Sequence, residues 1–367
     1  STARRSQGVE SYQDTVAGGG DPRPELVVAV DDLPITDPGQ YVSEREVARG
    51  GMGRIIAATD RILGRPVALK ELLHADAENA ARFRREAFIT ARLQHPAIVP
   101  IYEAGRWPDG EPFYAMKLVS GRSLAELIGE RDTFTARLGL LPHVLTAAQA
   151  VAYAHSQQII HRDLKPANVL VGEFGETVVI DWGLAKKIGE EEAEAEPVTR
   201  GGEGLTQVGA VMGTPWYMPP EQAAGAAVDE RADVYALGAM LYQVLAAVPP
   251  YHEAPWERLL AAIAAGPPRP IEALAPTLAD ELAAIVHKAM ARDPADRYRH
   301  AGALADDLLR FQTGQIVAAH SYSAGQLLRR YWRRHRAALS VATAAIVVLA
   351  LVVLAAFVET GRERRNA

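Results

Sequence analysis

The sequence predicts an α+β protein with two lobes, in which a strand-rich lobe precedes a larger helical one. Three observations support this prediction. A glycine-rich turn at 48–55 lies between two strand-like segments, and an Ala- and Leu-rich stretch at 137–157 has the composition of a long buried helix. The 367 residues are too many for one small core. A charge-free stretch near the carboxyl end adds one predicted transmembrane helix.

The composition excludes several classes of protein. The net charge of -6 argues against general nucleic-acid binding, because that function requires a strongly basic face. The chain contains no cysteine, which rules out disulfide scaffolds, thiolate zinc sites and cysteine nucleophiles. No nucleic-acid partner is therefore expected.

The strand-rich lobe begins after a tail. Residues 1–40 contain a run of glycines, scattered proline and aspartate, and little periodicity, so we interpret them as a flexible tail. In the glycine-rich turn that follows, main-chain N–H groups can approach phosphate oxygens closely. An apolar strand then ends in Lys70, and a helix is predicted from 75 to 93. Glu86 lies near the apolar face of this helix, so we favour it over Glu78, in the first turn, as the partner of Lys70.

The most informative stretch is His161–Leu170, which reads HRDLKPANVL. It supplies an acid at Asp163, a cation at Lys165 and an amide at Asn168, and apolar runs lie on both sides. A polar loop held rigidly between buried elements is where catalytic groups tend to lie. A second acidic motif, Asp181–Gly183, follows shortly afterwards.

Together these two segments closely resemble the catalytic loop and the metal-binding motif of protein kinases. The glycine-rich turn departs from the G-x-G-x-x-G-x-V pattern of that family, since Ala48 replaces the first glycine and Ile55 replaces the valine. Gly50 and Gly53, at the tip, remain. Lys165 fits the D-x-K-x-x-N pattern of serine/threonine kinases, so the resemblance implies that group and not the tyrosine kinases.

The resemblance implies a role for each residue of the catalytic loop. Asp163 would accept the proton of the substrate hydroxyl, and Lys165 would steady the transferring phosphoryl group. Asn168 and Asp181 would hold magnesium, a hard cation that prefers oxygen ligands. These roles define the expected catalytic and metal-binding residues of the helical lobe.

A nucleotide site is implied in the same way. Lys70, paired with Glu86, would contact the α- and β-phosphates. Met116 would lie behind the adenine as the gatekeeper. Lys117 stands where most relatives carry Glu. Adenine is recognised there by main-chain groups, so this difference should change the nucleotide specificity little. The predicted nucleotide-binding positions are Ala48, Gly50, Gly51, Gly53, Ile55, Ala68, Lys70, Met116, Lys117, Val119 and Leu170. The implied cofactors are ATP and Mg²⁺, with Mn²⁺ as the alternative metal.

Structural roles follow for residues around the catalytic loop. Asp233 would cap the main chain of that loop from a following helix, and Glu221 would form a buried ion pair with Arg297. Trp182 replaces the usual Phe after the metal-binding aspartate, and Pro219 replaces the usual Ala before P-E. The residues given structural roles are His161, Arg162, Trp182, Glu221, Asp233 and Arg297.

The activation segment is expected at 181–221. A phosphate there can neutralise Arg162, which precedes the catalytic acid, and thereby order the segment. We predict autophosphorylation at Thr206 first and then at Thr199. Thr214 would form a hydrogen bond near the catalytic loop.

Residues 337–358 contain no charged side chain, and a helix of this length would span roughly 33 Å, enough for a hydrocarbon core. Arginines and aromatics in the preceding segment, 313–336, suit a membrane interface, and the positive-inside rule places that side in the cytoplasm. We therefore expect a single-pass protein of the inner (plasma) membrane with a cytoplasmic kinase domain. A buried helix of a soluble domain is the alternative.

The predicted organisation is a tail at 1–40, a kinase N-lobe at 41–117, a C-lobe at 118–312, a basic juxtamembrane segment at 313–336, a transmembrane helix at 337–358 and a short or truncated tail at 359–367. The resemblance implies a bacterial, receptor-type serine/threonine kinase that transfers the γ-phosphoryl group of ATP to protein hydroxyls in transmembrane signalling. A catalytically silent scaffold and a small-molecule kinase are the alternatives. Protein substrates are the expected partners, and a homodimer is left open.

Overall fold

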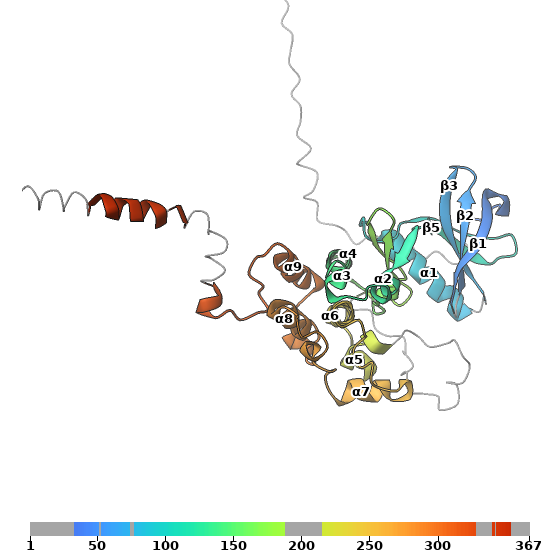
Figure 1. Cartoon of the computed structure of the whole chain (residues 1–367). Coiled ribbons are helices and arrows are strands. Elements are labelled where there is room, and N and C mark those ends of the chain that lie inside the picture. Colours follow the sequence, from blue (N-terminus) through green and yellow to red (C-terminus); the bar gives the residue numbers. More distant parts are fainter. Residues whose placement is uncertain are drawn as a thin grey trace, which may run out of the picture. The chain divides into compact units, whose positions relative to one another are not determined.

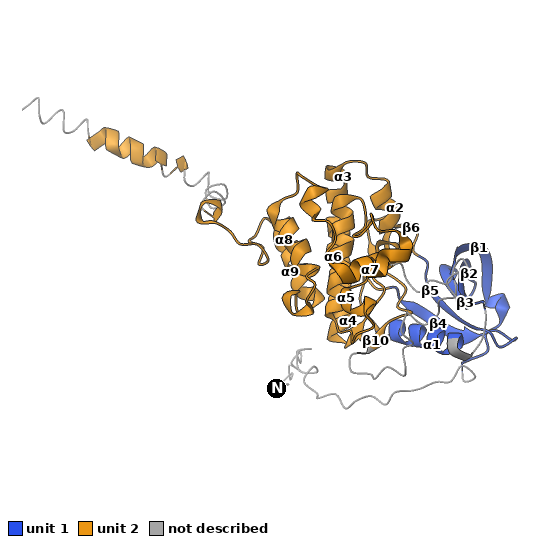
Figure 2. Ribbon diagram, turned by 90° about the horizontal axis from the view of Figure 1, so that it is seen from below, with its two compact units in different colours: residues 1–92, 99–118 blue, residues 93–98, 119–367 orange. Residues whose placement is uncertain are grey.

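The computed structural model describes residues 33–50, 53–73, 77–187, 215–327, 340–341 and 343–353. The chain divides into two compact units, which Figure 2 shows in different colours. Unit 1 consists of residues 1–92 and 99–118, and unit 2 of residues 93–98 and 119–367. Unit 1 holds the large sheet and unit 2 holds all but one of the described α-helices, so the predicted two-lobe α+β organisation is confirmed.

Unit 1 is built on a five-stranded antiparallel sheet with the strand order β1-β2-β3-β5-β4 (Figure 1). Strand β5 is the most buried strand of this sheet, which fits its mainly apolar sequence. The helix of this unit packs against β3 and β4. The elements of unit 1 are β1 (Tyr41–Arg49), β2 (Gly53–Asp60), β3 (Arg65–Leu72), α1 (Ala77–Arg92), β4 (Ile101–Arg106), β5 (Pro112–Lys117) and the 3₁₀ helix η2 (Pro38–Gln40).

The residues just before β1 differ from the expected flexible tail. Residues 33–40 lie along the sheet, where Ile35 pairs in parallel with Arg106 at the free edge of β4. Asp37 caps η2 by accepting a hydrogen bond from Gly39 N at 2.8 Å. The sequence did not predict this arrangement because so short a segment carries no alternation of apolar and polar residues.

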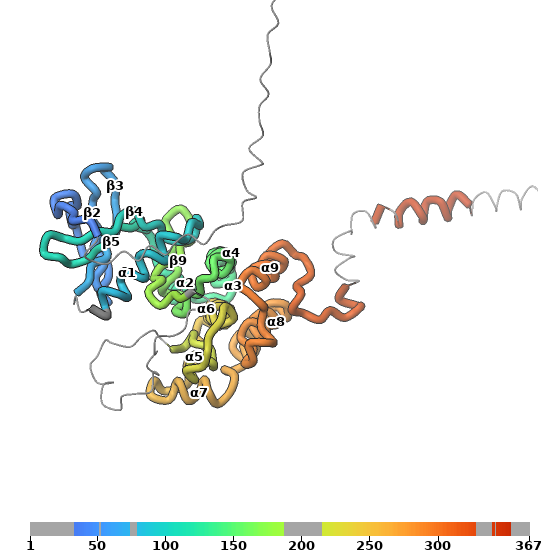
Figure 3. Tube along the Cα trace, turned by 180° about the vertical axis from the view of Figure 1, so that it is seen from behind, coloured from blue at the N-terminus to red at the C-terminus, as the bar shows by residue number. Residues whose placement is uncertain are grey.

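Unit 2 is mainly helical, and α4, α6, α8 and α9 pack against one another (Figure 3). Helix α6 is buried along almost its whole length and is the centre of the unit. The helices are α2 (Leu124–Gly129), α3 (Phe134–Leu138), α4 (Leu141–Ser156), α5 (Pro220–Ala223), α6 (Arg231–Ala246), α7 (Leu259–Ala265), α8 (Asp280–Ala289) and α9 (Ala301–Gln312). The 3₁₀ helices are η3 (Pro166–Asn168), η4 (Pro215–Tyr217), η5 (Trp256–Arg258), η6 (Ile271–Ala273) and η7 (Pro294–Asp296).

The single long helix expected at 137–157 is in fact two helices. Helix α3 ends at Leu138, and α4 starts at Leu141 with Pro142 in its first turn. Proline is accepted in a first turn, where its missing N–H would have no partner inside the helix, whereas in the middle of a longer helix it would break the hydrogen-bond ladder. Pro142 therefore explains the break.

Short strands surround the catalytic loop of unit 2. One sheet has the order β6-β8-β9, and a second pair joins β7 to β10. Strand β7 ends immediately before the loop and β8 starts immediately after it. The strands are β6 (Gly121–Ser123), β7 (Ile159–Ile160), β8 (Val169–Gly172), β9 (Thr177–Val179) and β10 (Lys186–Lys187).

The chain after α9 is fastened back onto that helix by Asp307, whose side chain is buried. Its carboxylate accepts hydrogen bonds from the main-chain N–H groups of Ala318, at 2.8 Å, and Ala319, at 2.9 Å. It also accepts from the Tyr298 hydroxyl at 3.0 Å and from Arg310 at 3.0 Å. Unit 2 thus continues in contact with its helices beyond α9.

Within the described parts of the chain, no helix combines the length and the apolar character needed to cross a membrane. Of the predicted span at 337–358, only 340–341 and 343–353 are described, and they are helical and exposed. The rest of that span and the tail at 359–367 lie outside the described residues.

Candidate active site

The first part of the candidate site lies in unit 1 and consists of a buried ion pair. Lys70 Nζ donates to Glu86 Oε1 at 2.5 Å, and the Tyr114 hydroxyl donates to the same oxygen at 2.7 Å. The Glu86 side chain is 3% exposed and that of Lys70 is 14% exposed. The structure therefore brings the predicted pair together on β3 and α1. The side chain of Glu78, the alternative partner, lies outside the described residues.

The strand register and one aromatic contact fix this pair. Lys70 lies opposite Ile55 of β2 and Tyr114 of β5 in the sheet. Phe83, one helical turn before Glu86, packs on the Tyr114 ring with centroids 5.0 Å apart. Because Phe83 and Glu86 lie three residues apart on one face of α1, this packing orients the carboxylate toward β3. The arrangement presents a fixed cation, which is what phosphate binding requires.

The other predicted nucleotide-binding positions are divided between the two units. Ala48 faces Ile55 across β1 and β2, and Ala68 pairs with Met116 across β3 and β5. Lys117 N donates to Pro100 O at 3.1 Å. Val119 and Leu170 belong to unit 2, where Leu170 lies on β8. Gly51 lies outside the described residues, and the remaining positions, Gly50 and Gly53, bound the turn, where Gly50 N donates to Gly53 O at 2.8 Å.

The second part of the site is the catalytic loop of unit 2. Lys165 Nζ donates to Asp163 Oδ2 at 2.7 Å. Asn168 Nδ2 donates to the main-chain oxygen of Asp163 at 2.9 Å and lies 3.3 Å from Asp163 Oδ2. The structure thus places the predicted acid, cation and amide in one hydrogen-bonded group. Because both Nδ2 contacts go to Asp163, the orientation of the amide is fixed and Asn168 Oδ1 is left as the atom that can accept or coordinate.

A buried carboxylate holds the main chain of this loop. Asp233, in the first turn of α6, accepts hydrogen bonds from His161 N at 2.8 Å and from Arg162 N at 2.9 Å. Arg162 has a φ of 69° and Asp181 has a φ of 65°, both in the left-handed region that residues other than glycine rarely adopt. The hydrogen bonds to Asp233 offset the conformational cost at Arg162, so Asp233 determines the shape of the loop.

His155, which sequence reasoning missed, is a third donor to Asp233. Its Nε2 lies 2.9 Å from Asp233 Oδ2, and its side chain is 5% exposed. Burial by itself raises the pKa of Asp233, but hydrogen bonds and charge interactions with His155 and His161 outweigh burial, and the pKa of Asp233 is lower than usual. The sequence shows only a histidine at the end of a helix, a position that histidine often takes for the helix dipole alone.

His161 and Trp182 form a buried aromatic contact beneath the loop. Their ring centroids lie 4.5 Å apart, and His161 Nε2 lies 3.2 Å from Ile180 O. Both side chains are almost fully buried. Trp182 therefore packs in the core of unit 2, next to the predicted metal-binding residue Asp181.

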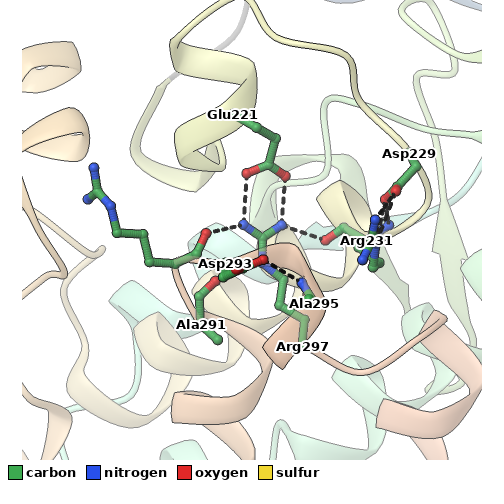
Figure 4. A network of polar contacts seen from close by, with 8 residues as sticks. Glu221, Asp229, Arg231, Ala291, Asp293, Ala295 and Arg297 are labelled. Atoms are coloured by element: carbon green, nitrogen blue, oxygen red, sulfur yellow. Dashed lines mark hydrogen bonds and ion pairs between the residues drawn. The ribbon is translucent and has the colours of Figure 1, made fainter.

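Glu221 and Arg297 form the predicted ion pair, which Figure 4 shows with its surrounding contacts. The pair is bidentate, with distances of 2.7 and 2.8 Å, and the Arg297 side chain is completely buried. The remaining donor capacity of the guanidinium goes to three main-chain oxygens, those of Ala291, Arg231 and Arg292. Such full satisfaction is what a buried arginine requires.

A small cavity of about 30 Å³ lies beside the catalytic loop, within unit 2. Asp163 and Arg162 line it together with Tyr217, Met218 and Pro219. The predicted activation-segment residues Thr199, Thr206 and Thr214 lie outside the described residues.

Residues 41–309 match the model of the protein kinase domain family. The chain belongs to the protein kinase family. The probable serine/threonine-protein kinase PknB of Corynebacterium glutamicum is 36% identical over 292 residues, which cover 76% of this chain and 43% of that protein. Serine/threonine-protein kinase PknB of Mycobacterium tuberculosis is 36% identical over 272 residues, with coverage of 72% and 42%. The chain therefore spans less than half the length of these curated relatives.

The PknI kinase domain of Mycobacterium tuberculosis is a similar solved structure, with a TM-score of 0.55 and 28% sequence identity. The similarity covers 74% of this chain and 96% of the PknI chain.

The side chains of this kinase domain fit a magnesium ion bound together with phosphates. Among the described residues, no cluster of three or more His, Cys, Asp or Glu side chains can hold a metal on its own. Magnesium usually keeps several waters and takes only one or two protein carboxylates plus phosphate oxygens. The carboxylate of Asp181 and the oriented Oδ1 of Asn168 meet this smaller requirement.

We expect Glu221→Ala to destabilise the kinase domain by about 3–5 kcal/mol, because it leaves the buried guanidinium of Arg297 without its counter-charge. Urea unfolding measures this loss. Glu253→Ala is the matched control, since Glu253 pairs with Arg269 at the surface, where such pairs contribute at most about 1 kcal/mol. Equal destabilisation by the two substitutions would contradict the structural role of the buried pair.

The pKa of Asp233 predicts a pH dependence of stability. Because this pKa is lower in the folded than in the unfolded chain, ionised Asp233 stabilises the folded state. This contribution to stability is fully present above the unfolded pKa of about 3.9 and is lost as the pH falls through the folded pKa. We expect Asp233→Asn to be less stable than the wild type at pH 7, with a difference that shrinks below about pH 4. Thermal unfolding at several pH values measures it, and a difference independent of pH would refute the assignment.

Proposed function

We propose that this chain is a serine/threonine protein kinase that transfers the γ-phosphoryl group of ATP to hydroxyl groups of proteins. The observation that carries the proposal is the hydrogen-bonded group of Asp163, Lys165 and Asn168 in the catalytic loop. Membership of the kinase family and the names of the curated relatives support it. Protein serine and threonine residues are the proposed acceptors.

The geometry of the loop supports a division of roles. In the reaction, the substrate oxygen forms a bond to the γ-phosphorus, the bond from that phosphorus to the oxygen it shares with ADP breaks, and the hydroxyl proton leaves. The Asp163 carboxylate is the proposed acceptor of that proton, and it is oriented by Lys165 Nζ at 2.7 Å. The Lys165 ammonium is also the proposed counter-charge for the transferring group, because phosphoryl transfer depends on positioning and charge neutralisation.

ATP with Mg²⁺ is the proposed co-substrate, and Mn²⁺ is a proposed substitute for the metal. When bound, the metal neutralises charge on the β- and γ-phosphates. Lys70 is the proposed cation for the α- and β-phosphates, since its ion pair with Glu86 keeps the ammonium fixed. Asn168 and Asp181 are the proposed metal ligands. Activation through phosphorylation of Thr206 and Thr199 is also part of the proposal, although both residues lie outside the described part of the chain.

We infer that the chain is anchored in the inner (plasma) membrane by one helix at 337–358, with the kinase domain in the cytoplasm. The absence of charge in that stretch supports the proposal, as do the arginines and aromatics that precede it at 329–336. Transmembrane signalling by a bacterial, receptor-type kinase is the corresponding biological role. A homodimer is left open.

We expect Asp163→Asn to reduce phosphate incorporation from labelled ATP with magnesium by about 10²–10⁴-fold, because the general base is lost. The unfolding temperature should stay close to that of the wild type, since the amide can still accept the hydrogen bond from Lys165. Asp280→Asn, at the exposed start of α8, is the matched control and should retain full activity. If the wild-type chain incorporates no label into itself or into added protein, the scaffold alternative is favoured. If label appears only on metabolites, a small-molecule kinase is favoured.

The proposed membrane span predicts sensitivity to charge at its centre. The double substitution Val347→Asp with Leu351→Asp should release the chain from carbonate-washed membranes, because each buried aspartate costs about 2.5–3.5 kcal/mol. Ser340→Asp is the control, since a charge near the end of the span can reach the interface. Equal membrane fractions for the double variant and the wild type would argue against a transmembrane helix at 337–358.

A further inference from the structure

The segment of residues 33–40, which we call the N-terminal strap, extends the sheet of unit 1. Thr36 N donates to Arg106 O at 2.9 Å, and Arg106 N donates to Pro34 O at 3.0 Å. Arg106 Nε also donates to Leu33 O at 3.1 Å. Strand β4 is otherwise the edge of the sheet, so the strap covers an edge that would present unpaired main-chain groups. The match to the kinase family begins only at residue 41, after the strap.

A single carboxylate, that of Glu103, fastens the strap to β4. It accepts hydrogen bonds from Thr36 Oγ1 at 3.1 Å, from Gln40 Nε2 at 3.0 Å and from the Tyr41 hydroxyl at 2.8 Å. Burial, the hydrogen bond to Glu103 and its charge raise the pKa of Tyr41, so the tyrosine remains a donor. Thr36 and Gln40 therefore provide the side-chain hydrogen bonds of the strap to the body of unit 1.

The docked strap leaves no room for a larger group on Thr36. The residue is 6% exposed. A Cβ atom at Gly105 would lie 2.7 Å from Thr36 Oγ1 and 2.9 Å from the Phe113 ring, so even a methyl group is excluded on that side. Glu103 closes a second side, because its carboxylate lies directly on the Thr36 hydroxyl. Arg106, the cation in contact with the strap, is bound at Leu33 O, three residues before Thr36.

The strap nevertheless lies at the periphery of unit 1. It pairs with β4 through one parallel bridge, and its outer face is exposed, with Ile35 at 63%. Short peripheral segments of this kind open by local unfolding at much lower free energy than the core of a domain. When the strap opens, the Thr36 hydroxyl becomes accessible to modification.

We propose that Thr36 is a phosphorylation site and that its phosphate keeps the strap detached from β4. This inference rests on the proposed kinase function, which supplies the phosphate. Thr36 Oγ1 forms a bond to the γ-phosphorus of ATP, the bond from that phosphorus to ADP breaks, and the hydroxyl proton leaves with the general base. A phosphate then faces the Glu103 carboxylate as a like charge in a space that is already filled, so the docked state is excluded. Detachment exposes the edge of β4 and removes two of the three donors to Glu103, those of Thr36 and Gln40.

The amide of Arg106 reports directly on the strap, since it donates to Pro34 O only while the strap is docked. In hydrogen exchange on the full chain, Thr36→Glu should make this amide exchange at least about tenfold faster than in the wild type. Thr36→Val removes the hydroxyl without adding charge and should retain most of the protection. Thr59→Glu is the matched control, because Thr59 also donates to a glutamate, Glu44, but at the exposed surface, and it should leave the Arg106 amide protected.

Two results of this experiment would overturn the proposal. Wild-type protection of Arg106 in Thr36→Glu would show that the docked strap tolerates the charge. Equally fast exchange in Thr36→Val and Thr36→Glu would show that loss of the hydroxyl, and not the added charge, opens the strap.

The source of the phosphate is tested by incubating the full chain with labelled ATP and magnesium and mapping the labelled residues. Label at Thr36 that is absent in Asp163→Asn is the expected result. Label at other residues but not at Thr36 would refute this inference while leaving the kinase function intact. No label on the chain or on added protein substrates would refute the proposed function, and with it this route to Thr36.

Discussion

The carboxylate of Asp233 is the contact on which the candidate active site of unit 2 depends. It is buried in α6, the central helix of that unit, and binds the main-chain N–H groups of two successive loop residues, His161 and Arg162. A buried carboxylate is stable only when its oxygens are satisfied, and here the two N–H groups and His155 satisfy them. The contacts that shape the catalytic loop are thus the same contacts that satisfy the buried charge of Asp233. A substitution that removes them both releases the loop and leaves the carboxylate unsatisfied.

In unit 1, the ion pair of Lys70 and Glu86 is likewise held by buried neighbouring residues. Glu86 and Lys70 are charges of opposite sign with little access to water, and the Tyr114 hydroxyl satisfies the carboxylate further. The side-chain packing of Phe83 on Tyr114 determines where α1 places its glutamate. In both units, a polar group that chemistry requires is held by residues that belong to the apolar core, which makes its position as well defined as the core itself.

The sequence was sufficient to predict the elements that carry a strong local pattern. The strand carrying Lys70, the helix carrying Glu86 and the polar loop between two apolar runs are present where the residue types indicated, although the strand continues to Leu72. Contacts formed across long distances in the chain were not predictable in this way. His155 and Asp233 are 78 residues apart, and only packing of α4 against α6 reveals their contact. The strap at 33–40 was missed because its order comes from β4 and not from its own composition.

The closure of the chain onto Asp307 has a consequence for the extent of unit 2. The family match ends at residue 309, and α9 ends at Gln312, yet two of the four donors to this buried anion come from Ala318 and Ala319. A polypeptide cut after Gln312 would keep α9 but would leave the buried charge with half of its partners, and a cut at residue 309 would also remove Arg310 and the end of α9. The physical limit of the catalytic domain therefore lies near residue 320. The residues after it are attached to the domain at Ala318 and Ala319 and not at the end of α9.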